Sequence, residues 1–326
     1  MNVYKERSYV ACIRDGFRFF AKNLKPLCRI MLPYCIIISV VSMLFNVYML
    51  RMGVTITNGT TIQISDIMLG YVFLFLIIVA MMLCFLYADG RLMLYNRRMM
   101  GVEPPANKLG TGKHWIITQK RTNRMVKRML PFMAIFMIMT LVCMLTLGAF
   151  LAVGSACGLK GLMLTILIMP IFLLLFIALF AAIQPLTYSA FEFLIEDRKI
   201  TLRNIWKSYK NGCKYTLKYM GVTLLTYFIT IVITLILRLP EYVFTQAYAE
   251  SFRESLLNGE DVHISSLAMI MILIFSALIS AIVLLVNHIP LNFVQLYLYG
   301  DAKMKQNQHV SDYITNEAYN KLTLSN

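Results

Sequence analysis

The stretch LMLTILIMPIFLLLFIALFAAIQPL, residues 162–186, decides the class of fold, because it contains no charged residue. A bilayer has a hydrocarbon core about 30 Å thick, and a helix rises about 1.5 Å per residue, so about 20 apolar residues cross it. The backbone must satisfy its own hydrogen bonds there, which a helix does. This stretch is therefore predicted to be a transmembrane helix.

Runs of the same kind recur along the chain and give six predicted spans: Ile30–Leu50, Met68–Ala88, Leu130–Val153, Leu162–Leu186, Met220–Leu237 and Ile264–Val286. The 326 residues are 59% hydrophobic and 14% charged, whereas a soluble domain carries about 25% charged residues. This composition excludes a soluble globule. We expect an all-α polytopic membrane protein, a single membrane domain with six transmembrane helices in three hairpins.

The positive charges indicate the orientation of these spans. Of the 31 Lys and Arg residues, all but Arg51, Lys160, Arg238 and Arg253 lie in the N-terminal arm, two long basic segments and the C-terminal tail. Cytoplasmic loops hold the excess of Lys and Arg. Both termini are therefore predicted to be cytoplasmic, in the cell inner membrane, with the first span kept as an anchor rather than cleaved.

The formal net charge of +15 raises the question of the partner. No nucleic-acid motif accompanies the charge, so we expect no nucleic acid as a partner. Anionic lipid headgroups on the cytoplasmic face are the expected partner instead, since each near-surface Lys or Arg contributes about 1 kcal/mol to binding them.

Two basic segments align without gaps: RDGFRFFAKNLKPLCRIMLPY, residues 14–34, and RNIWKSYKNGCKYTLKYMG, residues 203–221. In each, basic residues recur at threes and fours beside an apolar and aromatic stripe, the pattern of an amphipathic helix in the headgroup plane. The candidate headgroup contacts are Arg14, Arg18, Lys22, Lys25, Arg29, Arg203, Lys207, Lys210, Lys214 and Lys218.

A poorer copy of the same pattern, with Trp115 in the place of Phe17, precedes the middle pair of spans. We therefore predict three units of an interfacial helix and a hairpin, at about residues 1–109, 110–200 and 201–326. The alternative is that any helix entering a membrane from the cytoplasm acquires basic residues and interfacial aromatics without common ancestry. The sequence leaves both explanations open.

The aromatic–Lys–Asn pattern leading into an apolar span, FRFFAKNLKPL and WKSYKNGCKYTL, resembles a diffuse group of bacterial six-span membrane proteins. The group includes the membrane domain attached to some glycerophosphodiester phosphodiesterases. The resemblance implies a helical membrane module. It implies no enzymatic activity, because the chain carries no soluble phosphodiesterase domain.

The search for chemistry finds no predicted catalytic, metal or cofactor site. The four histidines and seven cysteines show no metal-ligand spacing, and LGTGKH at residues 109–114 lacks the residues of a phosphate loop. Glu192 and Glu196 share one helix face and offer an acid–base pair, but Arg198 and Lys199 follow them at once. A solvated helix end is the favoured interpretation of this pair.

Polar residues within or beside the predicted spans form the other candidate site. They are Asn46, Gln184, Asn287, His288 and Asn292. With Pro185 and Pro290 nearby, the fourth and sixth spans are predicted to break and line a polar pocket near the cytoplasmic end of the sixth span. The alternative is that these residues form interhelical hydrogen bonds or lie at the interface.

Three functions are consistent with these features of the sequence. The first is a non-enzymatic scaffold, assembly or regulatory module of the cell envelope, whose protein partner we expect on the outer segment between Pro240 and Ile264. The second is a transporter or lipid-handling protein that uses the polar pocket. The third is an intramembrane lipid-modifying enzyme. The sequence does not set the oligomeric state.

Overall fold

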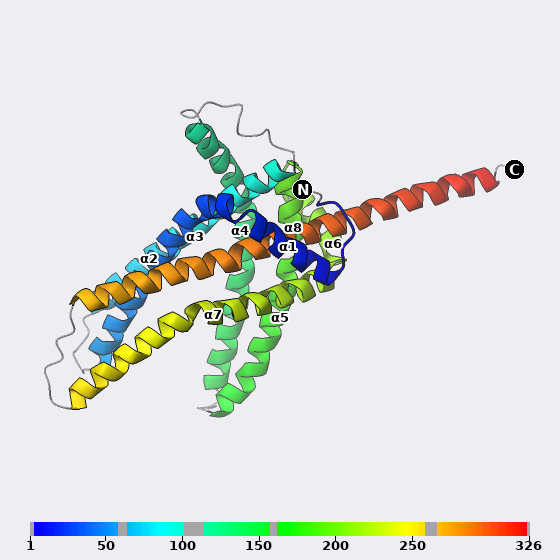
Figure 1. The fold of residues 1–326 in the computed structure, drawn as a ribbon. Helices are drawn as coiled ribbons and strands as arrows, with labels where there is room; N and C mark the ends of the chain where they lie inside the picture. The colour runs from blue at the N-terminus through cyan, green and yellow to red at the C-terminus, as the bar shows by residue number, and fades with distance from the viewer. Residues whose placement is uncertain (1–2, 58–63, 101–113, 157–161, 258–265, 325–326) are drawn as a thin grey trace. The chain divides into compact units, whose positions relative to one another are not determined.

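The computed structural model describes the backbone of residues 3–57, 64–100, 114–156, 162–257 and 266–324. Within these ranges it describes the side chains of 3–43, 77, 79–100, 119–150, 169–243, 271 and 274–308. The described chain forms eight helices (Figure 1): α1 (Tyr9–Lys22), α2 (Leu24–Thr57), α3 (Ile64–Met99), α4 (His114–Ala156), α5 (Leu162–Ile195), α6 (Leu202–Cys213), α7 (Thr216–Leu257) and α8 (Ser266–Leu324). The predicted all-α class is confirmed for these ranges.

Five helices of the described part are long and apolar enough to cross a membrane: Leu24–Met43, Gln119–Phe150, Met169–Ile195, Thr216–Val243 and Ile274–Gln308. They coincide with the predicted first, third, fourth, fifth and sixth spans. The chain is thus a helical multi-pass membrane protein. The second predicted span lies within α3, mostly on residues whose side chains fall outside the described ones, so the count of six stays a prediction.

The predicted breaks at two prolines are wrong. Helix α5 continues through Pro185, and α8 continues through Pro290. A proline removes one N–H donor, and neighbouring helices and Ser or Thr side chains satisfy the groups that it releases in membrane proteins. Both helices therefore stay continuous beside the predicted pocket residues.

Two of the three predicted interfacial helices are separate elements, and the third is not. Helix α1 ends before Asn23, whose side chain donates to the Phe19 carbonyl at 2.9 Å and so competes with the helical backbone. Helix α6 ends just after Gly212. In the middle copy Arg121, a good helix former, stands where Asn23 and Gly212 stand in the others. The basic segment there is consequently continuous with α4.

The outer segment between Pro240 and Ile264, where a protein partner is expected, does not begin at a helix boundary. Helix α7 runs through Pro240 to Leu257, while the side chains beyond Val243 and the backbone of residues 258–265 lie outside the described residues. The protein contact expected on this segment therefore stays a prediction.

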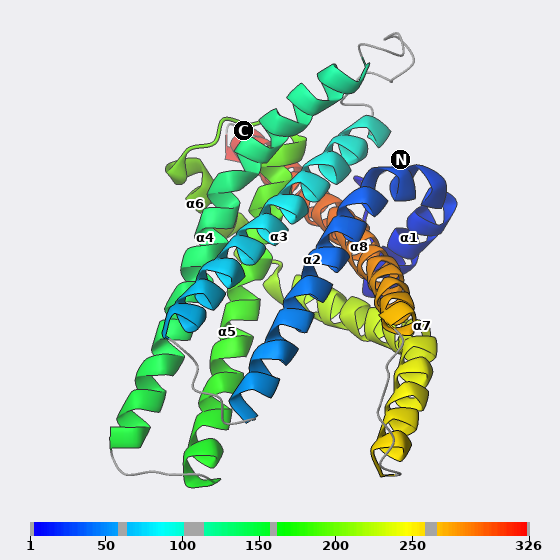
Figure 2. The same ribbon diagram turned by 90° about the vertical axis from the view of Figure 1, so that its left-hand side faces the viewer.

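The chain divides into two compact units. Unit 1 comprises Met1–Arg18, Met93–Leu225 and Phe293–Asn326, and unit 2 comprises Phe19–Leu92 and Thr226–Asn292. In unit 1, α4 and α5 lie side by side and antiparallel (Figures 1 and 2), and α6 packs against α5. Phe132 of α4, Phe193 of α5 and Ile205 of α6 share the buried cluster that joins these three helices.

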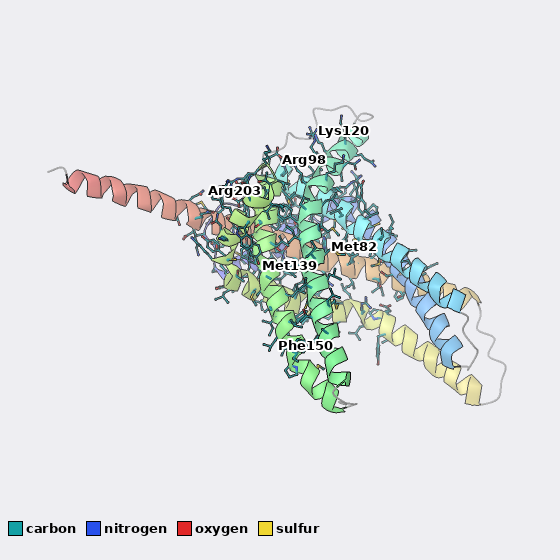
Figure 3. The ribbon with its side chains drawn as sticks, turned by 180° about the vertical axis from the view of Figure 1, so that it is seen from behind. Met82, Arg98, Lys120, Met139, Phe150 and Arg203 are labelled. Carbon is teal, nitrogen blue, oxygen red and sulfur yellow. The ribbon has the colours of Figure 1, made fainter. Side chains whose placement is uncertain are left out.

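The outer surface of the α4–α5 pair suits hydrocarbon. Met144 and Leu145 of α4 and Leu174 of α5 are 63%, 65% and 67% exposed. A contiguous exposed apolar surface of this kind is rare on a soluble monomer and marks contact with a membrane or partner. Figure 3 shows Met139 and Phe150 along the same helix, with Lys120 at its opposite end.

Candidate functional site

The outer face of α6 in unit 1 combines exposed apolar and exposed basic side chains. Leu202 is 78% exposed and Trp206 is 60% exposed. Arg203 and Lys207 are exposed beside them. Trp206 stacks on Tyr209 with a centroid separation of 5.7 Å, and the Lys210 ammonium lies 5.5 Å from the centre of the Trp206 ring. An amphipathic side of this composition fits the headgroup plane, where an aromatic ring and a cation both find partners.

The inner face of α6 is buried against α5. Ile205, Ser208 and Gly212 recur at threes and fours and are buried. The Thr201 hydroxyl caps the helix by accepting a 3.3 Å hydrogen bond from the Asn204 amide. At Gly212 a Cβ atom would lie 3.0 Å from the Pro185 backbone, so a larger residue would require the two helices to shift by a few tenths of an ångström. The burial of this face directs the basic residues outward.

Glu192 lies at the centre of a buried charge network in unit 1. Its side chain is 3% exposed, and one oxygen accepts a hydrogen bond from the Ser208 hydroxyl of α6. The other oxygen lies 2.8 Å from the Lys303 ammonium of α8 and 2.9 Å from the Arg198 guanidinium. The favoured prediction of a solvated helix end is therefore wrong for Glu192, because Ser208 and Lys303 give the carboxylate partners inside the protein.

Glu196, one turn further on, completes this network. Its carboxylate lies 2.8 Å from Arg198 and 3.2 Å from Lys303, and it accepts a hydrogen bond from the Tyr299 hydroxyl. Burial is the main cause that raises the pKa of Tyr4, and the negative charge of Glu196 raises it further. The Tyr4 ring lies edge-on to the Tyr299 ring, with 6.4 Å between the ring centroids. Two carboxylates thus face two cations, so neither glutamate is an isolated acid or base.

A second buried ion pair fixes Lys218 at the start of α7. Its ammonium lies 2.5 Å from the Asp301 carboxylate of α8, which is 1% exposed, and donates to the Arg7 carbonyl at 2.7 Å. The Arg7 amide in turn donates to Asp301 at 2.7 Å. Lys218 was predicted to contact headgroups, but its ammonium has internal partners. Its place on the basic stripe did not reveal this, because Asp301 lies far along the chain.

The other nine predicted headgroup residues are all exposed: Arg14, Arg18, Lys22, Lys25, Arg29, Arg203, Lys207, Lys210 and Lys214. Arg14, although 69% exposed, also lies 3.5 Å from Asp15. Figure 3 shows Arg98, Lys120 and Arg203 of unit 1 toward the end of the α4–α5 pair that lies opposite Phe150. Positive charge therefore gathers at one end of these helices, as the predicted topology requires.

Two of the predicted pocket residues, Gln184 and Asn287, have hydrogen-bond partners within the protein. In unit 1, Gln184 accepts from the Thr223 hydroxyl at 3.3 Å and donates to the carbonyl one turn before it at 3.2 Å. In unit 2, Asn287 accepts from the Thr234 hydroxyl at 3.1 Å, and Asn292 is half-buried. The bonds from Thr223 to Gln184 and from Thr234 to Asn287 are interhelical hydrogen bonds, which the alternative to a polar pocket predicts. The Asn46 side chain lies outside the described residues.

His288 of unit 2 has a charged partner that the sequence did not indicate. Its Nε2 atom lies 2.5 Å from the Asp89 carboxylate of α3, and its ring lies 5.9 Å from the Phe85 ring. Asp89 comes one residue after the end of the predicted second span, so the pattern within the spans does not indicate it. Helix α3 continues to Met99 and carries Asp89 into this contact.

Among the described residues, no group of three or more His, Cys, Asp or Glu side chains is placed to hold a metal ion. Comparisons of the chain with protein-family models, with curated proteins and with solved structures find no match.

Proposed function

We propose that this chain is a non-enzymatic scaffold, assembly or regulatory module of the cell inner membrane that binds anionic headgroups through its basic amphipathic helices. The observation that carries the proposal is the outer face of α6, where Leu202 and Trp206 are exposed beside Arg203 and Lys207. Large apolar side chains next to cations are costly in water and favourable at a headgroup boundary. The predicted cytoplasmic position of both termini places α1 and α6 on the anionic leaflet.

The charge of this surface supports lipid binding that depends on salt. Each exposed Lys or Arg near an anionic leaflet contributes about 1 kcal/mol, and ionic screening limits the effect to about 10 Å at 0.1 M salt. The aromatic and aliphatic side chains of α6 add an apolar contribution that salt does not weaken. Binding should therefore weaken with added salt but persist in part.

The buried charge network supports a module without catalysis. An intramembrane enzyme that uses Glu192 and Glu196 would need one carboxyl group free to exchange a proton with substrate. Lys303 and Arg198 both contact the two carboxylates, and Ser208 donates to Glu192. This arrangement holds α6 and α8 against the end of α5.

The test is lipid retention by the full chain in nanodiscs of phosphatidylcholine and phosphatidylglycerol. Native mass spectrometry counts the phosphatidylglycerol molecules that remain bound. We expect the double variant R203Q/K207Q to retain fewer than the wild type, because two cations leave the exposed face of α6. The matched control R203K/K207R keeps both charges on the exposed face of α6 and should retain the wild-type number. Equal retention by R203Q/K207Q and wild type would contradict the proposal.

A second candidate function is transport or lipid handling coupled to protons, and the contact between His288 and Asp89 favours it. Ionisable pairs between transmembrane helices are frequent in proton relays. Proton flux into liposomes containing a pH-sensitive dye tests this candidate. Flux that exceeds that of empty liposomes and is lost in D89N would support it, whereas wild-type flux equal to that of empty liposomes would exclude it.

A further inference from the structure

Two arginines from different helices meet at one carboxylate in unit 1. Arg97 lies near the end of α3 and Arg128 lies in α4, and the Nη1 atoms of both face the same oxygen of Asp197. The Arg97 atom lies 3.6 Å from this oxygen, and Arg128 donates a hydrogen bond to it. The planar guanidinium group matches phosphate as well as carboxylate geometry, so two of them converging on one oxygen form an anion site.

Positive charge gathers at this point. Arg97 and Arg124 lie close enough to Arg128 to act on it electrostatically. Two guanidinium groups thus meet at the Asp197 carboxylate, and the charge of Arg124 acts on one of them. A phosphate monoester carries about −1.5 to −2 charges at neutral pH and would compensate the arginines more fully than one carboxylate does.

Arg97 is buried and held in place, whereas the Asp197 side chain is exposed and can leave the site. The Arg97 side chain is 8% exposed, and it donates a 2.9 Å hydrogen bond to the Leu194 carbonyl in the last turn of α5. Arg128 is 28% exposed, whereas Asp197 is 57% exposed. Arg124 is exposed as well. An incoming anion can therefore reach the arginines by displacing the Asp197 carboxylate outward.

The backbone conformation of Asp197 is one that often follows the end of a helix. Its φ of 59° lies in the left-handed region, which residues other than glycine adopt at a cost in energy. Asp197 follows α5 by two residues, and this conformation accompanies the placement of its carboxylate between the arginines.

We propose that Arg97, Arg124 and Arg128 bind the phosphate group of a phosphate monoester, and that Asp197 occupies the site until the phosphate displaces it. The phosphate belongs either to a lipid headgroup, such as phosphatidic acid, or to a soluble phosphate. Arg98, next to Arg97, lies at the basic end of unit 1 in Figure 3, which is the end predicted to face the cytoplasmic headgroups. This site differs from the outer face of α6, which the proposed function assigns to anionic lipids in general.

The experiment uses the full chain in nanodiscs and two probes. Inorganic phosphate is titrated into phosphatidylcholine nanodiscs, and affinity is read from the shift of the thermal unfolding midpoint. In the second arm, nanodiscs contain phosphatidic acid or phosphatidylglycerol at equal mole fraction, and native mass spectrometry counts the retained lipids. Binding of inorganic phosphate indicates a soluble ligand, and retention of phosphatidic acid above phosphatidylglycerol indicates a lipid.

Three variants decide the proposal in whichever arm binds. D197N removes the competing charge and should tighten binding about tenfold, while R128Q should weaken it about tenfold, since charge-assisted hydrogen bonds are strong. K127Q removes a neighbouring exposed charge on α4 and should change affinity less than about twofold. If R128Q does not fold, R124Q replaces it, because Arg124 is exposed.

The proposal is overturned if neither probe binds to wild type or D197N, if D197N leaves affinity unchanged, or if K127Q weakens binding as much as the arginine variant. Retention of phosphatidylglycerol by the wild type, which tests the proposed function, is read from the same nanodiscs and does not depend on Asp197. Failure of one proposal is therefore distinguishable from failure of the other.

Discussion

Replacing Glu192 with Gln is expected to destabilise the protein by about 3 kcal/mol, because it removes a buried charge that two helices share. Glu192 is 3% exposed and lies 2.8 Å from the Lys303 ammonium. Removal of one partner from a buried ion pair costs about 3–5 kcal/mol. The lower end applies, since Glu196 remains 3.2 Å from Lys303 and continues to offset its charge. Arg198 is 52% exposed, so solvent screens its interaction with Glu192 and loss of that interaction adds little to the destabilisation.

The assay is equilibrium unfolding in mixed micelles, with increasing mole fraction of dodecyl sulfate and helicity read by circular dichroism. The double variant E192Q/K303M removes both members of the pair. It should be less destabilised than the sum of the two single variants by about 2 kcal/mol, since the partners are in contact. The control K199Q alters an exposed side chain and should change stability by less than about 0.5 kcal/mol.

Two results would refute this reasoning. An E192Q protein as stable as the K199Q control would show that the charge network does not hold the helices together. Additive effects in the double variant would show that Glu192 and Lys303 do not interact in the folded protein.

Three further predictions use the same protein. G212A should cost about 1 kcal/mol, because its Cβ would lie 3.0 Å from the α5 backbone and overpacking outweighs the gain in helix propensity; unchanged stability in the micelle titration would contradict the close approach. At pH 8 a maleimide should modify exposed Cys213 but not Cys12, whose thiol pKa burial raises to about 11, as peptide mass spectrometry would show; Cys12 modification should appear only as the pH nears that pKa and more thiolate forms. D89N should destabilise the protein by about 2 kcal/mol through its contact with His288, and an unchanged unfolding curve would argue against that contact.

Sequence predicted the helices well where a local pattern sets them. An apolar run long enough to cross a bilayer specifies a helix by itself, and five of the six predicted spans coincide with helices of the expected length. Asn23 and Gly212, at equivalent places in the two better copies, mark the ends of the short basic helices. Arg121 in the third copy could have indicated the uninterrupted helix, because arginine neither caps nor breaks a helix.

Sequence failed where partners are distant along the chain. The residues that follow Glu192 in the sequence predict a solvated helix end. Its partners Ser208 and Lys303, however, come from two other helices. The spacing of Lys218 predicts that it lies on an exposed basic stripe. Its ammonium instead pairs with the buried carboxylate of Asp301. A helical period shows which residues share a face but not which other helix covers that face, and this covering decides whether a charge is exposed.

The lipid contact of α6 is most directly tested by the depth of Trp206. The sequence contains two tryptophans, so W115F leaves Trp206 as the sole tryptophan fluorophore. The variant is reconstituted into phosphatidylglycerol vesicles containing lipids brominated at different acyl positions, and fluorescence quenching is recorded. The account predicts strongest quenching by bromine nearest the headgroup, with weak quenching by aqueous iodide. Strong iodide quenching without quenching by any brominated lipid would place α6 in water and contradict its role as a headgroup-binding helix.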